Sequence, residues 1–235
     1  MLEKQPRLVV FVGTVGSGKS TQMELVAYKL RRKGFKTKVS TLKTNHLLSH
    51  LLTIAVQRIL VNSERNPFTI GVLIERKPLV LKKLFRLWLV LDAFSISVKF
   101  IWDVALPLRS GRIVLVEEYL PAIITDYAYI SKAVGLSPNV TIGVIRFLSR
   151  ILSSPGFMEI VFLDASQIVL QERWKLRGSP REKAEYLQIQ QTLLLLCSEK
   201  LSDHRLLRVD TTTQSVTETN EYVLTHLGLS GISAR

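Results

Sequence analysis

The segment with the clearest chemical meaning lies near the start of the chain and is rich in glycine. It follows the pattern G-x-x-x-x-G-K-[ST] and runs on into a second hydroxyl residue: Gly13, Thr14, Val15, Gly16, Ser17, Gly18, Lys19, Ser20 and Thr21. Glycines allow successive backbone N–H groups to turn toward one anion. Lys19 can reach the β- and γ-phosphates of a nucleoside triphosphate, and the Ser20 hydroxyl can ligate Mg²⁺. The segment is therefore predicted to be a phosphate-binding loop, with Lys19 as a catalytic cation.

Two consecutive glutamates could supply the carboxylate that a Mg²⁺ ion needs. Glu117 and Glu118 end an apolar run that begins at Ile113. A carboxylate at the end of a strand beside the loop can hold Mg²⁺ directly or through water. Glu117 is our candidate ligand together with Ser20, and Glu118 is the alternative. A solvated pair of surface glutamates is the competing interpretation.

Three arginines recur every four residues in a basic segment of the second half. Arg173, Arg177 and Arg181 flank Gly178-Ser179-Pro180. Because glycine and proline interrupt a helix, we expect a mobile lid over about residues 173–185 rather than one rigid helix face. Cations on such a lid can offset charge on a transferring phosphoryl group, so these arginines are candidate catalytic residues. A solvated basic helix end is the alternative.

These residues need elements that hold them together, and the hydrophobic pattern predicts about five strands. The strands share short apolar or alternating runs, which are typical of a sheet interior. They are residues 8–12, 36–42, 112–117, 158–163 and 206–209.

Apolar residues at helical spacing separate the predicted strands. After the loop, Met23, Val26 and Leu30 fall at positions i, i+3 and i+7. Further helices are expected over residues 46–61, 79–108, 121–134, 140–152, 167–174, 182–201 and 216–227. Strands that alternate with helices predict an α/β fold with a parallel sheet. Ligands bind at the carboxyl ends of such strands, where the loop, Glu117 and Asp164 should converge.

Length and composition favour one domain, predicted to span residues 1–235. With 47% hydrophobic residues, the chain can build a sizeable core. Cys197 is the single cysteine, so no internal disulfide can form, which favours the cytoplasm. No secretion signal is visible, and no run of roughly 18 residues is free of charge, so membrane insertion is not expected.

The net charge of +13 indicates anionic partners. Nucleotides satisfy that charge. The basic residues between positions 29 and 43 are interpreted as a solvated face, so nucleic acid is not the expected partner. The densely apolar segment 79–108 is either buried core or a homodimer interface.

Together, these motifs resemble the thymidylate kinase family of P-loop nucleoside monophosphate kinases. The segments that carry the similarity are residues 16–22, 105–111, 161–165, 173–178 and 208–212. The resemblance covers nearly the whole chain. It implies a P-loop kinase-type sheet with a lid, ATP and Mg²⁺ on the donor side, and a nucleotide as acceptor. It also implies that Lys43, Glu118 and Tyr119 lie on the acceptor side.

Several acceptor-side positions depart from the family pattern. Glu118 replaces an arginine that helps to hold phosphate, and Val15 replaces a charged side chain that faces the acceptor. The arginine expected on the long helix has no counterpart near residues 94–96, whereas Lys43 stands where the family has an arginine after the second strand. The donor half is therefore kept and the acceptor half is not, so thymidine monophosphate should be a poor acceptor.

Three functions fit these observations. The favoured one is a kinase that transfers the γ-phosphoryl group of ATP·Mg²⁺ to a nucleotide-like acceptor. The second is a nucleotide-binding or slowly ATP-hydrolysing regulator without an acceptor site. The third, a nucleic-acid-associated ATPase, rests on charge and would bind with steep salt dependence. A basic pocket beside the loop would favour the kinase, and a closed or apolar one the regulator.

Overall fold

The computed structural model describes residues 7–60, 69–152, 157–178, 184–201 and 205–229, and its centre is a parallel sheet. Within those residues, five strands lie in the order β2-β3-β1-β4-β5. Their bounds are Arg7–Gly13 (β1), Thr37–Leu42 (β2), Ile113–Glu118 (β3), Phe157–Asp164 (β4) and Leu206–Asp210 (β5). All neighbouring strands pair in parallel, as the alternation of strands and helices predicted.

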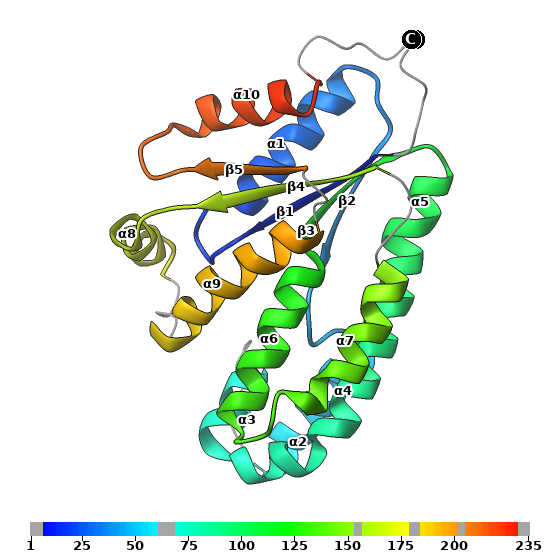
Figure 1. Cartoon of the computed structure of the whole chain (residues 1–235), viewed down its shortest axis with the longest axis vertical. Coiled ribbons are helices and arrows are strands. Elements are labelled where there is room, and N and C mark those ends of the chain that lie inside the picture. The colour runs from blue at the N-terminus through cyan, green and yellow to red at the C-terminus, as the bar shows by residue number, and fades with distance from the viewer. Residues whose placement is uncertain (1–6, 61–68, 153–156, 179–183, 202–204, 230–235) are drawn as a thin grey trace.

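Helices cover both faces of this sheet (Figure 1). One face carries α1 (Lys19–Arg32) and α10 (Val216–His226), against which Val9 and Phe11 of β1 pack. Val10 and Val12 point to the other face, because successive side chains of a strand alternate. Four helices cover that second face. They are α6 (Tyr119–Ala133), α7 (Asn139–Leu152), α9 (Ala184–Leu201) and the long helix α4 (Pro78–Phe100).

The long apolar helix predicted over residues 79–108 forms as three consecutive segments. After α4, the winding widens into a π-helix, η1 (Ile101–Ala105), and then returns to an α-helix, α5 (Leu106–Arg109). Pro107 accounts for the change, since it lacks an N–H and its ring crowds the carbonyl four residues earlier. The segment thus remains helical throughout, with a local defect before the proline.

The remaining helices extend the molecule beyond the carboxyl ends of the strands. α2 (Leu47–Leu60) and α3 (Thr69–Arg76) pack near the start of α4, and α8 (Gln167–Arg177) follows β4 (Figure 1). The pattern did not predict α3, which is short, whereas the other expected helices form with ends shifted by a few residues.

The α/β fold class with a parallel sheet is therefore confirmed. Across the described ranges, every helix is too short or too polar to cross a bilayer. The single-domain boundary at residues 1–235 stays a prediction. Part of the expected lid, including Arg181, falls within residues 179–183 and so lies outside the described residues.

Candidate active site

The glycine-rich segment joins β1 to α1 as a tight loop, and two of its glycines are required by close packing. A Cβ at Gly13 would lie 2.0 Å from the backbone carbonyl oxygen of Leu163 on the neighbouring strand. A Cβ at Gly16, where φ is +89°, would lie 2.7 Å from the Trp174 indole nitrogen. No residue with a side chain fits at either position without moving its neighbours.

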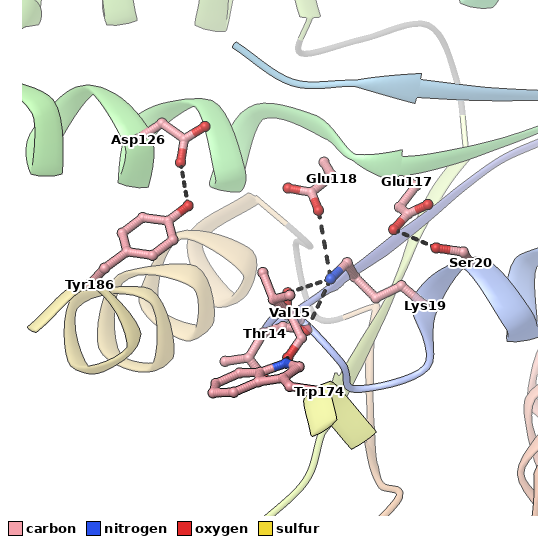
Figure 2. Close-up of polar contacts among 10 residues, drawn as sticks. Thr14, Val15, Lys19, Ser20, Glu117, Glu118, Asp126, Trp174 and Tyr186 are labelled. Carbon is pink, nitrogen blue, oxygen red and sulfur yellow. Dashed lines mark hydrogen bonds and ion pairs between the residues drawn. The ribbon is translucent and has the colours of Figure 1, made fainter. Parts of the chain in front are cut away.

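Lys19 begins α1 and turns back over the loop (Figure 2). Its Nζ donates hydrogen bonds to the carbonyl oxygens of Gly13, at 2.9 Å, and Thr14, at 3.0 Å. The same ammonium lies 3.6 Å from Oε1 of Glu118, and the lysine is only 5% exposed. One buried cation therefore stands at the mouth of the loop, between the loop carbonyls and a carboxylate.

Ser20 and Glu117 meet on the other side of this lysine. The Ser20 hydroxyl donates to Glu117 Oε1 at 2.9 Å. Burial raises the pKa of Glu117, and the nearby charge of Lys19 opposes that rise. Among the described residues, no group of three or more His, Cys, Asp or Glu forms a metal cage. Mg²⁺ is usually held by one or two protein oxygens together with phosphate and water, so the pairing of Ser20 with Glu117 fits it.

The chain turns sharply between β3 and α6. Glu118 has φ 83° and ψ −81°, and Tyr119 has φ 66°, which are conformations that residues with a Cβ rarely adopt. Tyr119 is 1% exposed, and its hydroxyl donates to the Leu152 carbonyl at 2.6 Å. The structure therefore gives the side chain of Tyr119 a packing role and does not bring it to the site, while Glu118 does face Lys19.

Beyond Glu118 lies a further carboxylate, Asp126, that the sequence did not single out. Asp126 accepts hydrogen bonds from the Thr44 hydroxyl at 2.6 Å and the Tyr186 hydroxyl at 2.8 Å (Figure 2). Burial raises the pKa of Asp126 to about 7, and the charge of Glu118 contributes in the same direction. Lys43, the remaining predicted acceptor-side residue, lies exposed just after β2.

A third carboxylate, Asp92, lies fully buried on α4 behind this region. It accepts from the Asn45 backbone N–H, the Ser49 hydroxyl and the Tyr127 hydroxyl, at 2.5 to 2.9 Å. Burial raises its pKa to about 6. Because its oxygens bind three donors from α6 and the start of α2, Asp92 joins these elements rather than facing a ligand. In the sequence, the signal for a buried carboxylate was an aspartate within the densely apolar segment 79–108.

α8 holds the phosphate loop from behind. The Trp174 indole N–H donates to the Val15 carbonyl at 3.0 Å. The Arg173 guanidinium donates to the carbonyl oxygens of Gly16, at 3.1 Å, and Thr211, at 2.8 Å. Arg177, at the end of the same helix, is exposed. The four-residue spacing grouped Arg173 with Arg177 and Arg181 as a candidate lid residue. Its guanidinium instead contacts the loop at Gly16 and the segment after β5 at Thr211.

Comparisons with known proteins agree with this architecture. No protein-family model and no curated protein matches the sequence. A thymidylate kinase from Candida albicans is similar in structure, with a TM-score of 0.61 and 14% identity over 95% of this chain and 92% of that one. A thymidylate kinase from Ehrlichia chaffeensis has a TM-score of 0.54 and 15% identity over 95% of this chain and 98% of that one. The chain therefore has the thymidylate kinase-like P-loop kinase fold that the resemblance implied.

Proposed function

We propose that this protein is an ATP·Mg²⁺-dependent phosphotransferase of the nucleotide-kinase type. The observation that carries the proposal is the buried Lys19 at the phosphate loop beside the hydrogen-bonded Ser20–Glu117 pair, with the charge of Lys19 acting on Glu117. A buried ammonium and two hard oxygen ligands at one loop provide the charge neutralisation that phosphoryl transfer needs. The fold shared with the two thymidylate kinases supports a nucleotide kinase, while the identity of the acceptor has to come from the site itself.

Each part of the site has a role in this proposal. The loop N–H groups and Lys19 would bind the β- and γ-phosphates, and Ser20 and Glu117 would hold the metal ion. When bound, Mg²⁺ supplies positive charge against the negative charge that develops on the phosphates. Arg173 and Trp174 fix the loop backbone, which makes Arg173 a positioning residue. Arg177 and Arg181 remain our candidate lid residues over the transferring group.

A regulator that binds ATP without an acceptor is the second candidate, and one contact favours it. Glu118 faces Lys19 at 3.6 Å, where a kinase for anionic acceptors would carry a cation. Two measurements separate the two candidates. Calorimetry measures ATP·Mg²⁺ binding, and an ADP-release assay tests a panel of nucleosides, nucleotides and simple alcohols as acceptors. Acceptor-dependent ADP release supports the phosphotransferase. ATP binding without any acceptor-dependent release would contradict it and support the regulator.

The proposal extends to a homodimer formed through the segment 79–108. Exposed apolar side chains follow one face of α4, η1 and α5, with exposed fractions from 40 to 73%: Leu87, Val90, Phe94, Val98, Ile101, Trp102 and Leu106. A stripe that spans about 29 Å of helix can face its own copy across a two-fold axis. Sedimentation equilibrium tests this directly, and a monomeric mass would contradict it. We place the protein in the cytoplasm, consistent with its single cysteine.

A further inference from the structure

The side of the site that should receive the acceptor is acidic. Glu118 ends β3 and faces Lys19, and Asp126 on α6 lies close enough to Glu118 for the two charges to interact. Glu117 beside them is engaged with Ser20. A phosphate-bearing acceptor carries two negative charges and would approach the donor between these carboxylates.

Cations from the surrounding elements do not reverse this balance. Lys99 on α4 pairs with Asp103 of η1 at 3.0 Å, and Lys38 of β2 pairs with the same carboxylate at 3.0 Å. Burial and the charges of Lys99 and Lys43 lower the pKa of His46 to about 4, so this imidazole is neutral at physiological pH. Lys43 lies exposed after β2, and the Lys19 ammonium is already engaged with Glu118 and the loop carbonyls.

The position of Glu118 is fixed by the backbone on both sides. Its own φ of 83° and the φ of 66° at Tyr119 are costly for residues with a Cβ, and such conformations persist only where the surroundings hold them. The buried ring of Tyr119, bonded to Leu152, provides that hold. The backbone of Glu118 is therefore held at the end of β3, within reach of Lys19 for its side chain.

We propose that the acceptor presents a free, uncharged hydroxyl group with no phosphate beside it, and that Glu118 excludes phosphate monoesters from the site. This inference rests on the proposed phosphotransferase function. A carboxylate about 4 Å from a phosphate charge, at an effective dielectric near 20, weakens binding by a factor of about 10³ before relaxation and screening. An uncharged alcohol pays no such penalty, and its hydroxyl can hydrogen-bond to carboxylates and hydroxyls such as those of Asp126 and Tyr186.

The transfer balances without any further reactant. The acceptor oxygen forms a bond to the γ-phosphorus of ATP, and the bond from that phosphorus to the bridging oxygen of the β-phosphate breaks. ADP leaves with the electron pair of the broken bond, and the hydroxyl proton is released to water. The products are a phosphate monoester, ADP and one proton.

The test compares matched acceptors that differ only in one phosphate. The assay uses ATP·Mg²⁺ and three proteins: the wild type, Glu118→Gln and the control Glu221→Gln. The control removes an exposed carboxylate from α10 on the opposite sheet face. The acceptors are nucleosides against their 5′-monophosphates and ribose against ribose 5-phosphate, with products identified by mass spectrometry. We expect kcat/KM to favour an uncharged member by at least about 100-fold in the wild type and the control. Glu118→Gln should narrow that ratio by about 10-fold or more.

The outcomes separate this inference from the function on which it rests. Wild-type protein that transfers equally well or better to a monophosphate overturns the inference and leaves the phosphotransferase standing. An unchanged ratio in Glu118→Gln overturns the role of Glu118 in selecting the acceptor. ATP binding without transfer to any member of the panel overturns both proposals. Because each ratio is measured within one variant, partial loss of folded protein does not alter it.

Discussion

The donor and acceptor sides of the site are built from the same sheet edge but differ in charge and in how they are assembled. On the proposed donor side, the loop N–H groups, Lys19 and the Ser20 hydroxyl come from one short segment that joins β1 to the first turn of α1. On the proposed acceptor side, Glu118 and Asp126 come from β3 and α6, and Tyr186 of α9 bonds to Asp126. A local motif thus forms the loop on one side, whereas the carboxylates of the opposite side are brought together by long-range packing.

The largest effect should come from removing the one buried cation of the donor side. Lys19→Ala leaves the phosphates without their ammonium and leaves Glu118 facing the loop without a counter-charge. ATP·Mg²⁺ affinity should fall by about 10³-fold or more, with the fold retained. Calorimetry measures this, and Lys200→Ala, an exposed lysine on α9, serves as the control. Unchanged affinity in Lys19→Ala would contradict the assignment of the phosphate-binding loop.

A smaller effect, confined to turnover, is expected at the end of α8. Arg177 is exposed and makes its contact only if the lid closes over the transferring group, so Arg177→Ala should lower kcat by about 10²-fold with little change in ATP binding. Lys175→Ala removes a neighbouring exposed cation of the same helix and should have little effect. Equal losses in ATP binding and kcat would instead show that Arg177 contacts the bound ground state.

On the acceptor side, Asp126 should make stability depend on pH. Its folded pKa, raised by burial to about 7, lies above the value for an unfolded aspartate, so the folded state holds the proton more tightly. Its contribution to stability is therefore complete below about pH 4 and is lost as the pH rises through 7. Asp126→Asn should remove about 4 kcal/mol of this dependence between pH 4 and 8.

Denaturant unfolding of wild type and Asp126→Asn at several pH values measures that difference. Glu221→Gln, which alters an exposed carboxylate, is the matched control. Asp92 also has a raised pKa, and its charge acts on Asp126, so the subtracted curves report the titration of Asp126 together with this coupling. Parallel curves for wild type and Asp126→Asn would show that the Asp126 carboxylate keeps its ordinary pKa in the folded protein.

The difference between the loop side and the carboxylate side also explains which features the sequence could predict. The phosphate loop and the five strands follow from contiguous patterns, because a glycine-rich turn and apolar runs encode their own geometry. Asp126 was missed, since its partners Thr44 and Tyr186 lie 82 and 60 positions away along the chain. Helical spacing placed Arg173 beside Arg177 correctly, yet it could not show that the Arg173 guanidinium turns back to Gly16. The sequence predicted one helix over residues 79–108. Pro107 was its signal for the change from α-helix to π-helix that the structure has at Ile101–Ala105.

The smallest predicted effect tests whether the donor side depends on α8 as well as on its own motif. Trp174 is 2% exposed, and its N–H bonds to the Val15 carbonyl while its ring lies against Gly16. Trp174→Phe keeps an aromatic ring in this space but removes the donor, leaving a carbonyl without its partner, which costs about 1 kcal/mol. Because that carbonyl belongs to the phosphate loop, part of the cost should appear as a loss of ATP affinity of about 2-fold, with the rest as reduced stability.

Calorimetry and thermal melting of Trp174→Phe separate these two contributions. Tyr222→Phe, which removes an exposed hydroxyl on α10 outside the loop, is the control and should change neither quantity. If Trp174→Phe lowers stability but leaves ATP affinity at the wild-type value, α8 merely packs against the loop. The donor side would then be organised by its own sequence alone, and the contrast with the acceptor side would be complete.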